Sequence, residues 1–206
     1  MDDVGIGIEK KSKKLDSDML KVVAYHESGH ALVGYLLKYA SSPVKLSIIP
    51  RGSGNLGYTQ PKDSEDSLKS KEHMIAEIYA LLAGRGAEVV RFGKITSGAS
   101  NDFERATEII KQMVTRLGMF PGFAPMIYEM SRDSGSCVSE QKRTEIENFV
   151  QNHLESMFNN VLDLLEKFRP ELDKLSLTLM DSEIIGYDKI KLMFPELEDS
   201  VTLKNQ

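Results

Sequence analysis

The spacing of hydrophobic residues along the 206-residue chain predicts a mainly α-helical fold. Over long stretches apolar residues recur every three to four positions, which is the period of one face of an α-helix. Two short stretches instead alternate apolar and polar residues, as half-buried β-strands do. The predicted helices are residues 17–39, 67–92, 103–117 and 140–168, and the predicted strands are residues 44–50 and 56–60.

The C-terminal part of the chain, at about residues 139–195, is predicted to be a helical region. Pro170 kinks or restarts the helix there, because proline lacks an N–H and clashes with the preceding turn. A stripe of leucine and methionine at helical spacing is typical of core packing, so we assign no chemistry to it. Residues 118–139 are predicted to form a loop, and residues 196–206 a polar tail.

One helix carries a motif with chemical meaning. The predicted helix at residues 17–39 contains HESGH at residues 26–30, an HExxH pattern in apolar surroundings. Residues four apart lie on one face of a helix, so His26 and His30 can both reach one metal ion. Glu27 points in another direction, where its carboxylate can take a proton from a water molecule. This division of roles is the one that zinc-dependent peptide hydrolysis needs.

A zinc site needs a third protein ligand, and two carboxylates are candidates. Glu88 follows a run of small residues in an apolar context, where it is a ligand, a partner of a ligand, or an ion-pair partner of Arg85 or Arg91. Asp102 lies at the start of the predicted helix 103–117, where the helix dipole alone favours a carboxylate. Composition by itself favours this helix-start role for Asp102. The residues expected to cap that helix are Thr96, Ser97, Ser100 and Asn101.

The two predicted strands are joined by a glycine-rich turn and are expected to form a hairpin. Gly57 within the second strand indicates close approach by another backbone. An edge strand beside a peptidase site can pair with an extended substrate, although an ordinary edge hairpin explains the pattern as well.

Charge and composition exclude several functional classes. The net charge of −5 and the pI near 5.5 do not provide the basic face that binds nucleic acid. No apolar run is long enough to span a bilayer, so we expect this chain to be soluble and to make no direct membrane contact. Cys137 is the single cysteine, which excludes an internal disulfide.

Taken together, the motifs make the chain resemble the peptidase domain of the FtsH family of membrane-anchored, ATP-dependent AAA zinc metalloproteases. The resemblance covers about residues 17–186. The motifs that carry it, in family order, are HESGH (26–30), IIPRG (48–52) with LGYTQ (56–60), AGRGAE (83–88) and SGASND (97–102).

The resemblance implies a site and a reaction. His26, His30 and Asp102 are the implied ligands of one Zn²⁺ per chain, with Glu27 as general base, and Glu88 remains the rival third ligand. The implied activity is endoproteolysis of unfolded polypeptides, which are expected to lie against Leu56, Gly57, Tyr58 and Thr59. Ser28 and Ser97 depart from the usual alanine and threonine, and neither change removes a ligand.

The resemblance also implies how the domain is used. The family's transmembrane segment and ATPase module are missing from this sequence, so we expect a peptidase domain at residues 17–195 after an interdomain linker at residues 1–16. ATP would act only through the missing module, in a homo-hexamer or a hetero-hexamer with a related subunit. The parent protein is expected in a bacterial inner membrane, a mitochondrial membrane or a plastid membrane.

Two other interpretations compete with a protease. One is a catalytically inactive, protease-like oligomerisation scaffold, which would be free to lose the set of His26, Glu27 and His30. The other is a metal-binding helical domain that does not cleave peptides.

Overall fold

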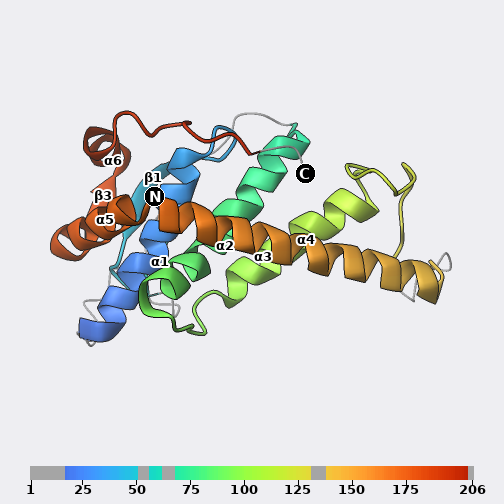
Figure 1. The fold of residues 1–206 in the computed structure, drawn as a ribbon, viewed down its shortest axis with the longest axis horizontal. Coiled ribbons are helices and arrows are strands. Elements are labelled where there is room, and N and C mark those ends of the chain that lie inside the picture. Colours follow the sequence, from blue (N-terminus) through green and yellow to red (C-terminus); the bar gives the residue numbers. More distant parts are fainter. Residues whose placement is uncertain (1–16, 51–55, 62–67, 131–137, 204–206) are drawn as a thin grey trace, which may run out of the picture.

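The computed structural model describes residues 17–50, 56–61, 68–130 and 138–203, and within them the fold is mainly α-helical, as predicted. A small antiparallel sheet lies beside the helices (Figure 1). The helices are α1 (Ser17–Leu36), α2 (Lys71–Phe92), α3 (Ser100–Thr115), α4 (Glu140–Lys167), α5 (Arg169–Ser182) and α6 (Tyr187–Met193). The strands are β1 (Pro43–Ser47), β2 (Tyr58–Pro61) and β3 (Ile184–Gly186).

Helices α1 and α2 form the centre of the core and approach each other closely. Nearly every side chain of α1 from Ala24 to Leu36 is buried. At Gly29 a Cβ atom would lie 2.4 Å from the carbonyl oxygen of Ala83 and 2.7 Å from the Cβ of Ala87. Only glycine fits at this crossing, so the run of small residues on α2 serves the close packing that it predicts.

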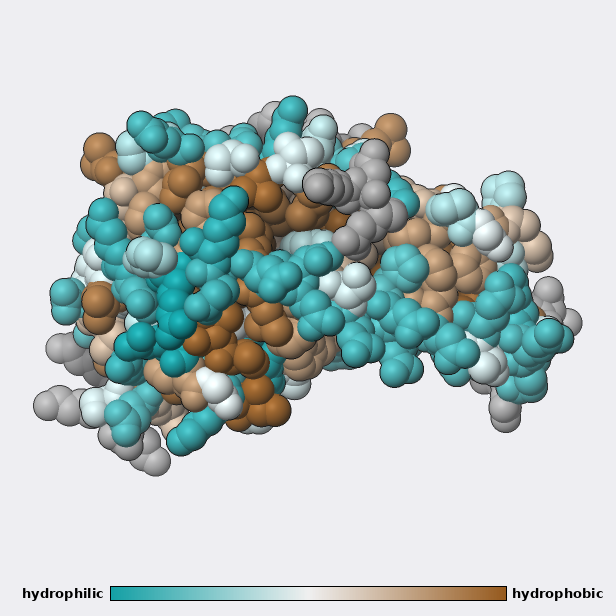
Figure 2. Space-filling view, viewed as in Figure 1, coloured by the Kyte–Doolittle hydropathy of each residue, from teal (hydrophilic) through white to brown (hydrophobic). Residues whose placement is uncertain are grey.

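The long helix α4 covers another face of α2 and projects away from the rest of the molecule (Figure 1). Gly86 of α2 packs against Val161 and Leu165 of α4. A band of hydrophilic side chains lies over α4 in the same view, in keeping with one buried face (Figure 2). The buried positions of α4 repeat at helical spacing and are Ile146, Val150, Met157, Val161 and Leu165.

Helix ends differ from the prediction mainly where local caps decide them. Helix α2 begins at Lys71 because the Ser70 side chain accepts a hydrogen bond from the His73 N–H, and Gly93 in a left-handed conformation ends it. Helix α1 ends at Leu36 and not at residue 39.

Helix α3 begins at Ser100, three residues earlier than predicted, and its N-cap is Ala99 without a side-chain hydrogen bond. The expected caps at Thr96, Ser97, Ser100 and Asn101 were therefore wrong. Thr96 is engaged elsewhere, because its N–H donates to Glu88 and its Oγ1 accepts from the Gly98 N–H.

The predicted hairpin is present, with β1 and β2 antiparallel, while its turn at residues 51–55 lies outside the described residues. On its other edge β1 pairs with β3, so the strand order is β2-β1-β3 and β2 is an edge strand. The sequence did not reveal β3, which lies within the predicted helical region.

Residues 194–201, partly within the predicted polar tail, run back to the end of α1. The Tyr35 hydroxyl donates to the carbonyl of Phe194, and the Val201 N–H donates to the carbonyl of Leu36. Of the helices in the described ranges, none combines the length and the hydrophobicity that crossing a bilayer would require.

Candidate metal centre

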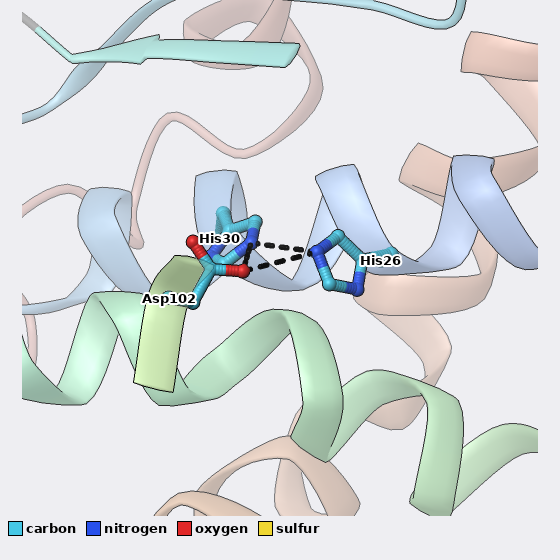
Figure 3. Close-up of side chains that lie close together, drawn as sticks. All are labelled: His26, His30 and Asp102. Carbon is cyan, nitrogen blue, oxygen red and sulfur yellow. Dashed lines mark hydrogen bonds and ion pairs between the residues drawn. The ribbon is translucent and has the colours of Figure 1, made fainter. Parts of the chain in front are cut away.

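Helix α1 places the two histidine rings one turn apart on the same face (Figure 3). The Nε2 atoms of His26 and His30 lie 3.0 Å apart. Both side chains are largely buried, with 12% and 14% of their surface exposed. The HExxH pattern therefore produces the pairing of imidazoles that its spacing predicts.

Asp102 joins the histidines from a different part of the chain. It lies in the first turn of α3, and its Oδ2 is 3.4 Å from the Nε2 of His26 and 3.4 Å from that of His30 (Figure 3). In the described part of the chain, these three residues are the group of His, Cys, Asp and Glu side chains whose donor atoms converge closely enough to hold a metal ion.

The spacing of the three donor atoms fits zinc. Zinc–nitrogen and zinc–oxygen bonds are about 2.0–2.2 Å long, so two ligands of a tetrahedral ion stand about 3.3–3.6 Å apart. The observed separations of 3.0, 3.4 and 3.4 Å are close to that value. With these three protein donors, a zinc ion would keep its fourth position for a water molecule or a substrate, as catalytic zinc sites do.

The other nitrogen of each ring determines which tautomer faces the centre. His26 Nδ1 lies 2.7 Å from Glu88 Oε1, and His30 Nδ1 lies 2.8 Å from the carbonyl oxygen of Ala80. Each acceptor holds a proton on Nδ1 and leaves the Nε2 of a neutral ring with a lone pair. Two such lone pairs at 3.0 Å repel each other, so the pair requires a proton or a metal ion between them.

Glu88 is therefore placed as a partner of a histidine and not beside Asp102. Its side chain is 1% exposed, accepts from the Thr96 N–H at 2.9 Å, and lies 3.6 Å from the Arg85 guanidinium. Both of its oxygens are engaged in these contacts. The predicted partner and ion-pair roles both describe its surroundings.

Electrostatics favour a positive charge at the centre. Burial lowers the pKa of His26, but its pairing with Asp102 and Glu88 outweighs burial and raises the pKa to about 9. Burial raises the pKa of Asp102, yet His26 and His30 hold it well below its usual range. Without a metal ion His26 thus carries a proton at neutral pH, and a metal ion must displace it.

Glu27 lies next to the histidines in a buried position and is 7% exposed. The hydroxyl of Thr59 on β2 is 2.7 Å from Glu27 Oε2. Gly57, just before β2, approaches so closely that a Cβ atom there would lie 3.0 Å from Glu27 Cγ and 2.9 Å from the Ser47 carbonyl oxygen. The predicted close approach at Gly57 is therefore observed, at a position just outside the strand.

A cleft of about 390 Å³ opens over the three donor atoms. His26, Glu27, His30 and Asp102 line it together with the end of the sheet and the N-terminal half of α2. Of the predicted substrate residues, Gly57, Tyr58 and Thr59 line the cleft, whereas Leu56 is 38% exposed and lies outside its lining.

Comparison with known proteins places the chain in a family. Residues 13–193 match the model of Peptidase family M41. The chain belongs to peptidase family M41. It is 38% identical, over 97% of its length, to a protein of Helicobacter pylori (strain J99) named ATP-dependent zinc metalloprotease FtsH. It is 36% identical to FtsH 2 of Petrotoga mobilis over 94% of its length, and 36% identical to FtsH of Pseudomonas putida over 95%.

Membership of M41 confirms the resemblance to the FtsH peptidase domain. The chain spans about a third of the length of these relatives, which is 33%, 32% and 34% of the three proteins. The predicted cofactor, Zn²⁺, agrees with the names of the relatives and with the donor set of two imidazoles and a carboxylate.

Sequence reasoning did not single out Gly84 as part of the M41 site. It lies on α2 directly beneath the histidines, where a Cβ atom would be 2.4 Å from His30 Nε2 and 2.7 Å from His26 Nε2. The sequence signal for it was the run of small residues before Glu88.

His153 and Ser28 do not belong to the donor set. His153 stacks on Phe149 with ring centroids 3.8 Å apart and is partly buried. Cys137 falls outside the described residues. Ser28 is fully buried, and its hydroxyl has no hydrogen-bond partner among the residues that the structure describes.

Proposed function

We propose that this M41 domain is a zinc-dependent endopeptidase that hydrolyses peptide bonds of unfolded polypeptides. The observation that carries the proposal is the convergence of His26, His30 and Asp102, with Glu27 beside them, in one open cleft. Two neutral nitrogen donors, one carboxylate and an open position are the ligand set of a hydrolytic zinc site.

The roles of the residues follow from their contacts. The Nε2 atoms of His26 and His30 and the Oδ2 of Asp102 would hold the ion. When bound, zinc polarises the substrate carbonyl and lowers the pKa of a water molecule. Glu27 would accept a proton from a water molecule as the water attacks the carbonyl carbon, and would return it to the nitrogen as the C–N bond breaks. Glu88 and the Ala80 carbonyl keep the histidines oriented throughout.

An extended substrate fits beside β2. Among the described strands, β2 pairs only with β1, and its residues Tyr58 and Thr59 line the cleft. Backbone pairing along a strand edge binds many sequences equally well, which suits a protease for unfolded chains. Pro61 ends β2 and has no N–H to donate, so it limits the length of this pairing.

We also propose that the domain works within a larger assembly. The relatives are named ATP-dependent, which supports an ATPase module that feeds unfolded chains to residues 17–195, with residues 1–16 as linker and residues 196–206 as tail. A hexamer and a membrane-anchored parent protein belong to the same proposal. Without such an assembly, the isolated domain would act only on substrates that are already unfolded.

The decisive experiment measures metal and cleavage together. The chain is purified without chelator or metal-affinity resin, and its zinc content is determined by mass spectrometry. We expect about one zinc per chain, cleavage of casein, and a Glu27→Gln variant that keeps its zinc and does not cleave.

Each contrary result has its own meaning. A folded chain that takes up no added zinc would overturn the proposal in favour of the oligomerisation scaffold. Zinc without cleavage of any unfolded protein would support a metal-binding domain, and full activity in Glu27→Gln would remove the general-base role.

A further inference from the structure

The hydroxyl of Thr59 contacts Glu27 at two points. Its Oγ1 lies 2.7 Å from the carboxylate oxygen Oε2 and 3.1 Å from the backbone carbonyl oxygen of the same residue. These contacts join β2 to α1 across a sequence separation of 32 residues. Its predicted role, as a strand residue that pairs with substrate, does not explain them.

We propose that Thr59 is a positioning residue that holds the Glu27 carboxylate in the orientation needed for proton transfer. The inference rests on the proposed role of Glu27 as general base. A hydroxyl has one proton to donate, and a charged carboxylate is a stronger acceptor than a carbonyl. In the resting site the proton of Thr59 therefore points to Oε2. Oε1 then remains available to the attacking water.

The second acceptor, the Glu27 carbonyl oxygen, lets Thr59 keep a hydrogen bond to Glu27 throughout the reaction. Once Glu27 has taken a proton, its carboxyl group is neutral and accepts more weakly. The Thr59 hydroxyl can then turn to the Glu27 carbonyl oxygen, without moving either backbone. When the proton leaves for the amine product, the hydroxyl returns to Oε2. Thr59 gains and loses no proton in this cycle.

The packing around Glu27 explains why a single hydroxyl can orient its carboxylate. A Cβ atom at residue 57 would lie within 3.0 Å of Glu27 Cγ and 2.8 Å of Val23 Cγ1, so the stem of Glu27 is already confined. The remaining freedom is at the carboxylate, and Thr59 contacts the carboxylate. Opposite Thr59, β1 contributes Leu46, which is fully buried and anchors the strand pair.

The position of Thr59 links substrate binding to the base. Under the proposed function the free edge of β2 pairs with substrate, and the side chain of the same strand orients Glu27. A substrate that orders β2 therefore also orders the base. This predicts that loss of the hydroxyl affects turnover more than binding.

The test compares Thr59→Val, which keeps the shape and removes the hydroxyl, with Thr59→Ser, which keeps the hydroxyl. We expect Thr59→Val to lower kcat about 10- to 100-fold with KM changed less than about threefold, because misplaced catalytic groups cost that much. Thr59→Ser should restore kcat to within about threefold of wild type. Both variants should retain one zinc per chain.

A matched control is Thr115→Val, because the Thr115 hydroxyl donates to the Lys111 carbonyl within α3, outside the cleft. It should leave kcat and KM unchanged. If Thr59→Val is as fast as wild type, or if its loss lies in KM, the positioning role is wrong. A wild-type chain that binds zinc and cleaves nothing instead overturns the proposed function itself.

A second measurement tests the contact without activity. In the metal-free chain, urea unfolding of Thr59→Val, Glu27→Met and the double variant forms a thermodynamic cycle. We expect Thr59→Val to destabilise the Glu27→Met chain less than it destabilises wild type. Equal losses in the two backgrounds would mean that Thr59 and Glu27 are not coupled.

Discussion

The two parts of the metal centre are held by different means. His26 and His30 stand on a helix that is buried on nearly all sides and crosses α2 at Gly29. Asp102 stands at the start of α3, after residues 93–98, which are all exposed. Close packing fixes the histidines, while polar contacts fix the segment that brings the carboxylate.

Those polar contacts are few and can be named. Arg85 donates to the Thr96 carbonyl at 2.5 Å and lies 5.4 Å from the centre of the Phe103 ring. Glu88 accepts from the Thr96 N–H and also holds His26. Exposed segments with few apolar contacts open at lower free energy than a packed core. The comparison therefore predicts that the carboxylate can be released while the histidine helix stays folded.

We expect the largest effect from a substitution that disturbs the close packing around His26 and His30. In Gly84→Ala the new methyl group would occupy the space of the histidine rings, so the rings must move apart. We expect zinc affinity to fall by more than about 100-fold and unfolding free energy to fall by about 1–3 kcal/mol, as in overpacked cores.

Metal titration and urea unfolding measure the two effects of Gly84→Ala. Gly186→Ala is the control, because the nearest atom to a Cβ there is the Val44 carbonyl oxygen at 4.0 Å. Normal zinc affinity in Gly84→Ala would show that the histidines tolerate displacement.

Substitutions of the carboxylates at the metal centre should release the metal and leave the fold intact. Asp102→Ala removes a donor, and we expect zinc to be lost in dialysis while the helical circular dichroism is unchanged. Glu88→Gln removes the charge behind His26 and should weaken zinc binding about 10- to 100-fold, as loss of such partners does. If Glu88→Gln loses more zinc than Asp102→Ala, the ligand assignment is reversed.

The stability of the metal-free fold and its affinity for zinc should depend on pH in opposite directions. The pKa of His26 is raised from 6.5 to about 9 in the metal-free fold, so its pairing stabilises the fold fully below about pH 6.5. That contribution is lost as the pH rises through about 9. We expect the urea midpoint of the metal-free chain to fall between these values, and zinc affinity to rise over the same range.

The controls for the pH dependence are two histidine variants. His26→Gln should abolish most of the decline, whereas His153→Gln should keep it, because His153 stacks on Phe149 far from the carboxylates. An unchanged midpoint across the range in wild type would contradict the raised pKa.

The smallest expected effect concerns a buried serine on the helix that carries the two histidines. Ser28 and Ser176 are both fully buried on helices, but within the described ranges only Ser176 donates a hydrogen bond, to the Leu172 carbonyl at 2.8 Å. Ser28→Ala should stabilise the chain by about 1 kcal/mol because an unpaired buried hydroxyl is costly. Ser176→Ala should destabilise it by a similar amount. Equal losses in urea unfolding would mean that Ser28 does have a partner.

Much of the fold and the donor set was predictable because the deciding signals are local. The helical periods and the HExxH spacing act within a few residues, and they place the two histidines without any knowledge of tertiary structure. The long-range meeting of Asp102 with the histidines is different, since residues alone favoured a helix-start role for it. Resemblance to a family, and not spacing, brought the three together.

Other features depend on contacts that no local pattern records. Strand β3 has three residues and exists because it pairs with β1, so its sequence carries no alternation long enough to detect. The cap of α3 was wrong because Thr96 is recruited by Glu88, which lies on another helix. Gly84 was not singled out because the two imidazole rings that it faces are brought to it only by the fold.

The contacts of residues 194–201 and of β3 determine when the domain can complete its fold during synthesis. The end of α1 is secured by Val201, and the sheet beside the cleft is completed only when β3 pairs with β1. A ribosome adds about 5–20 residues each second, so these partners emerge on the order of ten seconds after the histidines. During that interval the nascent chain contains the HExxH sequence but lacks the C-terminal segments that complete the fold around it. On the proposed function, cleavage of neighbouring nascent chains therefore waits until synthesis has passed these segments.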